Sequence, residues 1–217
     1  EFIRWNRMNF WDLSKGVPYG NSTFVAVGQS GTILTSSDGT SWTSRTSGIS
    51  SKLQGITYGN STFVVVNEVG TILTSSDGTS WTSRTSGTSN PLYGITYGNS
   101  TFVATGSSGT ILTSSDGTSW TSKTSGTSVL LTGIIYGNNN FVTVGKEGII
   151  FSSSDGTSWT SRTSGLEGES LNLYTIMFGS STFVAGGDKG NILTSSDGTT
   201  WTSRASGTSS QLRGIAY

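Results

Sequence analysis

One heptapeptide of this chain sets an aspartate beside a glycine and recurs five times, so its carboxylates are the first candidates for chemistry. The segment Ser36-Ser37-Asp38-Gly39-Thr40-Ser41-Trp42 returns in almost unchanged form four more times. Catalysis by carboxylates needs two of them in one site, and calcium needs several oxygen ligands around one ion. Because each copy supplies a single carboxylate, we interpret the aspartates as structural acceptors within a turn, packed under the tryptophan. The residues are Asp38, Asp77, Asp116, Asp155 and Asp197, with Trp42, Trp81, Trp120, Trp159 and Trp201.

The composition excludes several other kinds of site. The chain has no cysteine and no histidine, which removes disulfides, thiolate chemistry, histidine general bases and the usual zinc ligands. We therefore predict no metal and no cofactor. Twelve basic residues balance twelve acidic ones without a run of either sign, which argues against a nucleic-acid partner. No apolar stretch approaches the roughly 20 residues that a membrane span requires.

Two independent markers give the chain a period of 39 residues. The five aspartates are separated by 39, 39, 39 and 42 residues, and an aromatic residue followed by glycine keeps the same spacing from Tyr19 to Phe178. The sequence is divided into repeats at about 17–55, 56–94, 95–133, 134–175 and 176–214. Residues 1–16 and 215–217 are interpreted as parts of a further unit, and 1–217 as a single domain.

Each repeat contains four short segments with the residues of β-strands, separated by turn residues. In the second repeat these strands are expected at 55–58, 62–66, 71–75 and 80–85. The second is apolar almost throughout, as a strand buried on both faces must be, and the fourth is polar enough for an outer edge. Four antiparallel strands in about 40 residues predict an all-β fold, a β-propeller. A β-solenoid is the alternative, although its coils are usually shorter.

The repeated heptapeptide resembles the Asp-box, or bacterial neuraminidase repeat, of sialidase-like and photosystem-assembly-factor-like propellers. The family's box reads roughly Ser-x-Asp-x-Gly-x-Thr-Trp, whereas here Asp38 is followed directly by Gly39. The resemblance covers all five repeats. It implies that the box lies at the turn between the third and fourth strands of each blade.

Because many Asp-box propellers are glycosidases, the catalytic groups of those enzymes are the next candidates. The resemblance would require three arginines, a tyrosine nucleophile and an acidic partner, each contributed once by a different blade. Instead the arginines mostly occupy one repeated position, at Arg45, Arg84, Arg162 and Arg204, with Lys123 in the third repeat. A charge repeated on an outer strand is typical of a protected sheet edge. We therefore predict that the chain is not an enzyme.

The five copies differ mainly at two places, the turn between the second and third strands and the connection to the next repeat. In a four-stranded antiparallel sheet these two connections lie at the same end, and binding residues concentrate on loops of a rigid scaffold. The sequence thus predicts one variable, ligand-binding face; drift of unconstrained loops is the competing explanation. The predicted ligand-binding residues are Lys52, Gln54, Glu68, Tyr93, Thr132, Lys146, Tyr174, Asp188 and Arg213.

The two ends of the chain predict how the ring closes. The segment Arg4-Trp5-Asn6-Arg7 resembles a fourth strand, and residues 214–217 repeat the beginning of a first strand. Five whole blades with parts of a sixth are therefore predicted, and rings of five or seven blades are the alternatives.

These observations predict a binding or adhesion propeller outside a bacterial cell or on its surface. Its ligand would be a glycan or a protein. A structural subunit that assembles with copies of itself into a sheath or filament is one alternative, and a fragment of an Asp-box glycosidase is another.

Overall fold

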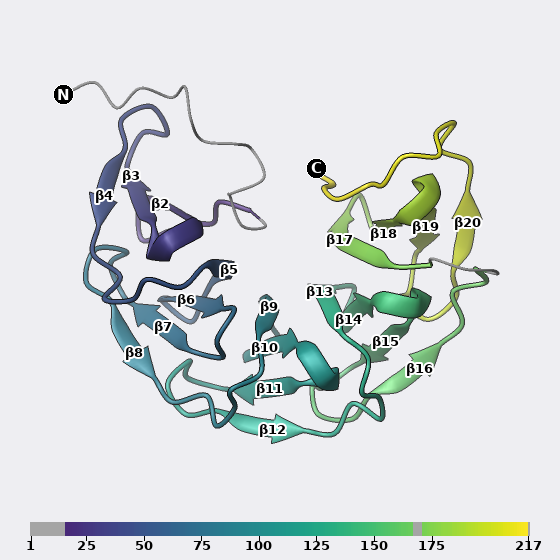
Figure 1. Cartoon of the computed structure of the whole chain (residues 1–217), viewed down its shortest axis with the longest axis horizontal. Helices are drawn as coiled ribbons and strands as arrows, with labels where there is room; N and C mark the ends of the chain where they lie inside the picture. Colours follow the sequence, from purple (N-terminus) through teal and green to yellow (C-terminus); the bar gives the residue numbers. More distant parts are fainter. Residues whose placement is uncertain (1–15, 167–170, 217) are drawn as a thin grey trace.

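The computed structural model describes residues 16–166 and 171–216 and contains five sheets, each with four antiparallel strands in sequence order. The sheets lie side by side along an arc around a shared axis, as the blades of a propeller do (Figure 1). The first strand of each blade is nearest the axis and the fourth lies on the outside. The predicted all-β propeller with five four-stranded blades is confirmed. Of the segments from which parts of a sixth blade were predicted, residues 1–16 and 215–217, only Gly16, Ile215 and Ala216 are described, and none of the three lies in a strand.

The first blade consists of β1 (Tyr19–Gly20), β2 (Thr23–Val27), β3 (Ile33–Ser36) and β4 (Thr43–Arg45). The second consists of β5 (Leu53–Gly59), β6 (Thr62–Asn67), β7 (Ile72–Ser75) and β8 (Thr82–Arg84). The third consists of β9 (Leu92–Gly98), β10 (Thr101–Gly106), β11 (Ile111–Ser114) and β12 (Thr121–Lys123). The fourth consists of β13 (Leu131–Gly137), β14 (Asn140–Gly145), β15 (Ile150–Ser153) and β16 (Thr160–Arg162). The fifth consists of β17 (Leu173–Gly179), β18 (Thr182–Gly187), β19 (Ile192–Ser195) and β20 (Thr202–Arg204).

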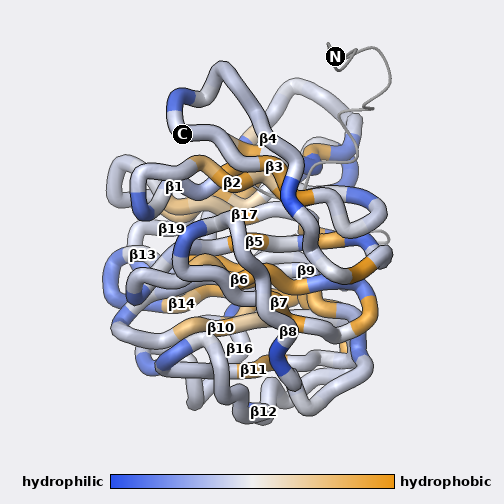
Figure 2. Tube along the Cα trace, turned by 90° about the vertical axis from the view of Figure 1, so that its left-hand side faces the viewer, coloured by the Kyte–Doolittle hydropathy of each residue, from blue (hydrophilic) through white to orange (hydrophobic). Residues whose placement is uncertain are grey.

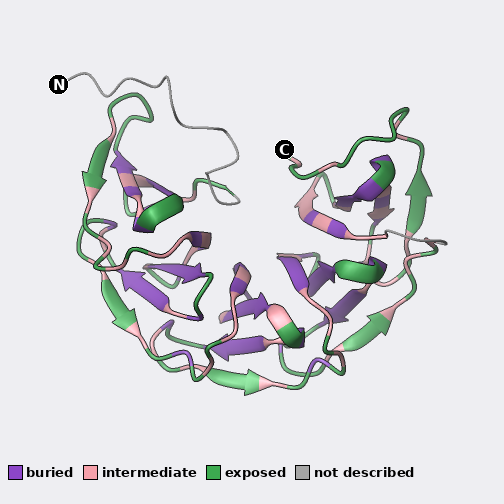
Figure 3. Ribbon diagram, viewed as in Figure 1, coloured by how far each residue is buried: buried purple, intermediate pink, exposed green. Residues whose placement is uncertain are grey.

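Burial follows the position of the strand in the blade. The second and third strands are largely buried and the fourth is exposed in every blade (Figure 3). The hydrophobic segments lie within the strands, while hydrophilic residues gather in the turns (Figure 2). This is the pattern that the sequence predicted, because an apolar run such as that of β6 must be covered on both faces. The side chain of each repeated arginine reaches from the fourth strand to the third. Arg84, for example, donates from Nε to Thr74 Oγ1 over 2.9 Å.

The turn between the first and second strands is a two-residue hairpin in every blade. Both central residues have positive φ, 45° at Asn60 and 57° at Ser61 in the second blade. Positive φ at both positions is the requirement of a type I′ turn, and asparagine tolerates this conformation better than most residues. The asparagine that follows the first-strand glycine in four of the five blades therefore has a conformational role in the hairpin.

Neighbouring blades meet through an aromatic ring that lies against a glycine. Tyr136 of β13 packs on Gly98 of β9, so closely that a Cβ at Gly98 would fall within the ring. The same contact joins Tyr58 to Gly20, Tyr97 to Gly59 and Phe178 to Gly137. Within its own blade the ring also packs on a second-strand phenylalanine, with Tyr136 and Phe141 centroids 4.6 Å apart. The aromatic-glycine pair that marked the repeat in the sequence is therefore the contact between repeats.

The first strand begins earlier than the sequence pattern predicted. In the second blade it extends from Leu53 to Gly59 rather than from Gly55 to Tyr58. The reason is a β-bulge: Leu53 pairs with Asn67 and Gly55 with Val66, so that Gln54 is an extra residue between them. A pattern of alternating residues does not reveal a bulge. The repeat boundaries near residues 55 and 94 consequently fall inside first strands.

We predict that Gly98→Ala destabilises the protein by about 3 kcal/mol or more, because neither the β9 backbone nor the Tyr136 ring can move without disturbing two blades. Gly214→Ala is the control, since a Cβ there meets no atom within 4 Å. Urea denaturation measures both variants. A Gly98→Ala variant as stable as the control would show that the aromatic-glycine contact is not needed.

A second prediction concerns Thr105, which is fully buried and whose hydroxyl has no hydrogen-bond partner. Val66 and Val144 occupy the same register in the neighbouring blades. Thr105→Val should therefore raise the free energy of unfolding by about 1–2 kcal/mol, since an unsatisfied buried hydroxyl costs about that much.

The matched control for Thr105→Val is Thr143→Val. The Thr143 hydroxyl is equally buried but donates to the Gly133 carbonyl over 2.8 Å. This second substitution should lower stability, as measured in the same denaturation experiment. Equal effects of the two substitutions would contradict the explanation.

Candidate functional site

The Asp-box closes the turn between the third and fourth strands with its own hydrogen bonds. In the first blade Asp38 Oδ1 accepts from the backbone N–H groups of Thr40 and Ser41, each over 2.8 Å. Ser36 donates from Oγ to the same oxygen and accepts from the Gly39 N–H. The Trp42 indole N–H donates to the Gly39 carbonyl over 3.2 Å. The carboxylate is thus used within its own turn.

The hydrogen bonds of the aspartate and the serine recur in the other four boxes. The indole bond recurs at Trp81, Trp120 and Trp159, whereas the buried indole N–H of Trp201 has no hydrogen-bond partner among the described residues. Hydrogen bonds from two backbone N–H groups and from nearby hydroxyls hold the pKa of each of the five carboxyls well below the ordinary value of 3.8. A carboxylate that is ionised and already bonded in this way is a poor general acid. Their geometry fits the structural role that the sequence predicted.

The end of the blades that carries the boxes also supplies hydrogen bonds between blades. Asn21 donates from Nδ2 to the carbonyl of Ser76 in the next box over 3.2 Å, and Asn138 donates to the carbonyl of Ser196 over 2.9 Å. The box glycine packs on the preceding blade as well, since a Cβ added at Gly78 would lie only 3.0 Å from Val25. Substitution here would disturb two blades at once, which gives a physical reason for the uniformity of this face.

The predicted variable face lies at the opposite end of the blades. The turn between second and third strands and the connection that enters the blade are joined there by backbone hydrogen bonds. Glu68 N–H donates to the Lys52 carbonyl, for example, and Asp188 N–H donates to the Asn172 carbonyl. The antiparallel order of the strands therefore brings the two variable segments together, as expected from the sequence.

One of the variable positions of the repeat is the extra residue of the β-bulge. It is Gln54 in the second blade, Tyr93 in the third, Thr132 in the fourth and Tyr174 in the fifth. A bulge leaves this residue outside the regular pairing and changes the direction of its side chain. The fold thus provides a position at the inner end of each blade where the side chain is not fixed by the ladder.

Polar side chains surround Asp188 on the fifth blade and donate hydrogen bonds to its carboxylate. Tyr174 Oη and Gln211 Nε2 donate to Asp188 Oδ1 over 2.8 and 2.9 Å, and Asn172 Nδ2 donates to Oδ2 over 2.8 Å. Arg213 donates from Nε and Nη2 to Gln211 Oε1, and its guanidinium carbon lies 5.0 Å from the Tyr174 ring centroid. These five side chains form one connected network, which we call the Asp188 cluster.

The charge states within the Asp188 cluster follow from its burial and hydrogen bonds. Burial alone would raise the pKa of Asp188, which is 5% exposed, but the donors from Tyr174, Asn172 and Gln211 outweigh it and hold the pKa below its ordinary value. Burial and the hydrogen bond to Asp188 raise the pKa of Tyr174. Near neutral pH the cluster therefore contains an aspartate anion, a neutral tyrosine and an arginine cation.

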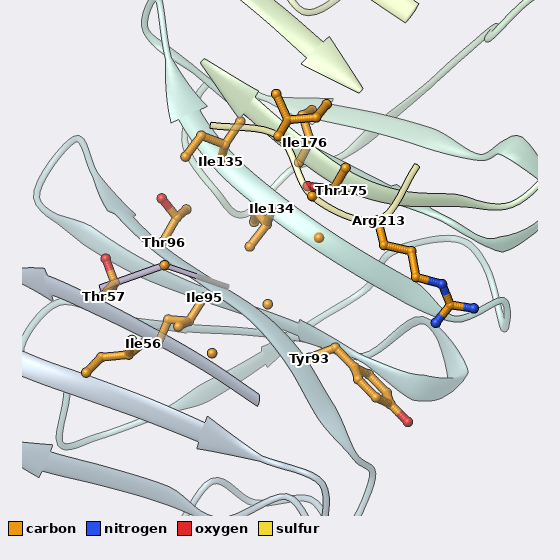
Figure 4. Close-up of a pocket in the computed structure, with 16 residues that line it drawn as sticks. Ile56, Thr57, Tyr93, Ile95, Thr96, Ile134, Ile135, Thr175, Ile176 and Arg213 are labelled. Atoms are coloured by element: carbon orange, nitrogen blue, oxygen red, sulfur yellow. The ribbon is translucent and has the colours of Figure 1, made fainter. Parts of the chain in front are cut away.

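The first strands surround a central pocket of about 650 Å³. Its wall contains isoleucines from successive blades, among them Ile56, Ile95 and Ile134. Tyr93 and Arg213 also line the pocket, and Figure 4 shows both side chains projecting from the same end of it. Among the lining residues from the described part of the chain, Arg213 is the only one with a charge. The arrangement is an apolar cavity with an aromatic residue and a cation at its mouth.

The structure brings some of the predicted ligand-binding residues together and separates others. Tyr93, Tyr174, Asp188 and Arg213 lie at or beside the pocket mouth. Thr132 departs from the expected exposed position: it is buried, and its hydroxyl oxygen lies within hydrogen-bond distance of two carbonyls, 2.7 Å from that of Leu173 and 3.1 Å from that of Val144.

The remaining predicted residues lie on the variable face but outside this group. Glu68 accepts a hydrogen bond from the Lys52 N–H over 2.9 Å, and Lys146 is exposed in the turn η4 (Lys146–Gly148). Gln54 is half-buried in its bulge. Asn172 and Gln211 were not among the residues predicted for the site. Both belong to the variable connections, so their polar side chains in these connections could have placed them among the predicted ligand-binding residues.

The pocket gives no support for hydrolysis by a pair of carboxylates. None of the described residues that line it is an aspartate or glutamate. Within residues 16–166 and 171–216 no three potential metal ligands gather at one place. The same ranges contain no helix that is long and apolar enough to cross a membrane.

Comparison with protein families gives one match, in which the profile of the DUF6242 beta propeller domain covers residues 50–167, more than half of the chain. The chain belongs to this family. Comparison with the curated proteins gave no match. The DUF6242 match and the solved propellers described next agree with the resemblance to Asp-box propellers that the sequence indicated.

Several solved structures have the same fold. YCF48 bound to D1 peptide is 16% identical with a TM-score of 0.68, over 90% of this chain and 67% of that one. The computationally designed Ika8 protein is 17% identical with a TM-score of 0.73, over 94% and 65%. A GH74 enzyme of Niastella koreensis is 19% identical with a TM-score of 0.62, over 88% and 30%. The DUF6242 chain thus spans about two thirds of the first two chains and less than a third of the third.

The box carboxylates predict how stability depends on pH. An unfolded chain takes up protons on these aspartates near their ordinary pKa, whereas the folded chain, with depressed pKa values, does not. Stability should therefore fall progressively as the pH drops below about 4, and the loss should end only below the folded pKa values. Urea denaturation from about pH 7 to about pH 2 measures this. Asp116→Asn should give a shallower acid slope, and an unchanged slope would contradict the assignment.

Proposed function

We propose that this DUF6242 propeller is a non-enzymatic binding module that holds a protein or glycan partner on its variable face. One observation carries the proposal: the bulge residues, which belong to the variable segments of the repeat, lie at the inner end of the blades beside a pocket with Tyr93 and Arg213 at its mouth. The residues of the opposite face are used in turns and in contacts between blades. A binding function explains why variation is confined to one end.

The solved structures support a protein partner in particular. One of the similar structures is YCF48 bound to a peptide, so the fold is compatible with peptide binding. GH74 enzymes share the fold too, but the pocket here has no carboxylate among its described lining residues. The structural-subunit function stays a prediction, since no contact among the described residues bears on it.

We also propose a location outside the cell or on its surface. The supporting observation is compositional: the chain lacks cysteine, has 11% charged residues, and builds its exposed fourth strands from threonine and serine. Adhesion to a glycan-bearing or protein surface is a function that such a location would serve.

The test replaces side chains on one face of the propeller at a time. The variable-face variant is Tyr93→Ala with Arg213→Gln, and the matched control replaces the exposed box serines Ser37, Ser76 and Ser115 with alanine. Both variants and the unaltered protein are applied to a glycan array and to a displayed library of random peptides. We expect the variable-face variant to lose binding at least about tenfold, since anchor residues at the centre of an interface dominate affinity.

The control variant should bind as the unaltered protein does, and thermal melting should show that both variants are folded. Equal binding by the two variants would place the site elsewhere. Loss of binding in the control alone would assign it to the box face.

A further inference from the structure

We infer that the mouth of the central pocket recognises an acidic peptide, in which a carboxylate binds Arg213 while a neighbouring apolar side chain enters the pocket. This inference rests on the proposed binding function and specifies its ligand. It depends on three features of the described residues: the way in which Arg213 is held, the isoleucine wall, and the distribution of charge around the mouth.

Arg213 is held in place before any ligand arrives. Its Nε and Nη2 donate to Gln211 Oε1 over 3.1 and 2.8 Å, and its guanidinium lies over the Tyr174 ring. Gln211 and Tyr174 are fixed in turn by Asp188. An arginine immobilised by stacking and hydrogen bonding loses less side-chain entropy on binding than a free one.

The guanidinium also keeps donors for a ligand. Within the described part of the chain Nη1 donates no hydrogen bond, and the side chain is exposed. The rigid fork of an arginine matches the two oxygens of a carboxylate, which makes this pairing stronger than a neutral hydrogen bond. The Asp188 cluster therefore presents a positioned cation at the pocket mouth.

Other charges do not compete for this position. Asp188 is buried and both of its carboxylate oxygens accept hydrogen bonds. Glu68 accepts from the Lys52 N–H in the second blade. Asp188 keeps its negative charge but is not among the described residues that line the pocket, where Arg213 is the only charged one, so the charge that a ligand meets at the mouth is positive.

The pocket itself favours an apolar group over a sugar. Ile56, Ile95, Ile134 and Ile176 contribute to its wall, and about 650 Å³ is enough for one or more side chains of a peptide. The described lining also contains the hydroxyls of Thr57, Thr96 and Thr175, but the isoleucines between them offer a sugar no partner for the hydrogen bonds that it would lose to water. Tyr93, at the same end as Arg213 in Figure 4, offers a flat surface for the peptide backbone or a ring.

The experiment selects displayed random hexapeptides on the folded protein and measures the affinity of the enriched peptides by calorimetry. Each peptide is compared with a version in which its carboxylates are replaced by amides. We expect enrichment of an acidic residue beside an aliphatic or aromatic one, and amide replacement should weaken binding at least about tenfold.

Three variants decide whether Arg213 is responsible. In Arg213→Gln the acidic peptide and its amide version should bind equally, and in Arg213→Glu the selection should turn to basic peptides. Lys123→Gln, which removes a cation from the outer strand β12 outside the pocket lining, should leave the preference unchanged. Melting curves confirm that the variants are folded.

The outcomes separate the two proposals. If peptides bind but the carboxylate effect persists in Arg213→Gln, the inference about the acidic peptide is wrong and the binding function stands. Binding of uronic acids or neutral glycans in place of peptides would overturn the inference in the same way. If neither peptides nor glycans bind the unaltered protein, both proposals fail.

Discussion

The packing of an aromatic ring on the glycine of the preceding blade is the contact on which the rest of the structure depends. A four-stranded sheet of this size cannot bury both faces by itself, so each blade is stable only against its neighbours. The glycine allows the next blade to approach until Tyr136 covers Gly98 and reaches Phe141 within its own sheet. In the third blade the chain of rings continues to a box tryptophan, with Phe102 and Trp120 centroids 6.5 Å apart.

This packing divides the molecule into two faces with different constraints. At the box end the turn asparagines and box glycines contact the neighbouring blade, and the box carboxylates satisfy their own turns. Little can change there without loss of stability. At the other end the bulges of the second to fifth blades each leave one residue outside the ladder, and side chains as different as Gln54, Tyr93 and Thr132 occupy this position. A repeated scaffold can therefore hold a surface that is not repeated.

The Asp188 cluster shows how such a surface gains chemical character. Its members come from two successive connections and one turn, and none of them belongs to the repeated pattern. Together they convert a variable loop end into a positioned cation beside an apolar pocket. Membership of the DUF6242 propeller family and the shared fold of YCF48 and GH74 proteins account for the scaffold. The character of the face comes from this chain's own differences between blades.

The sequence by itself determined the five complete four-stranded blades, the strand order and the closed turn of each Asp-box, because these depend on contacts between residues close in the chain. Asp38, Gly39 and Trp42 lie in one turn, so their spacing reveals their interaction. The tertiary structure alone decided the bulge at Tyr93, the burial of Thr132 and the meeting of Asp188 with Gln211. These depend on the register of one strand against another and on the approach of two connections. No local pattern specifies either, since both are fixed only when the blades pack.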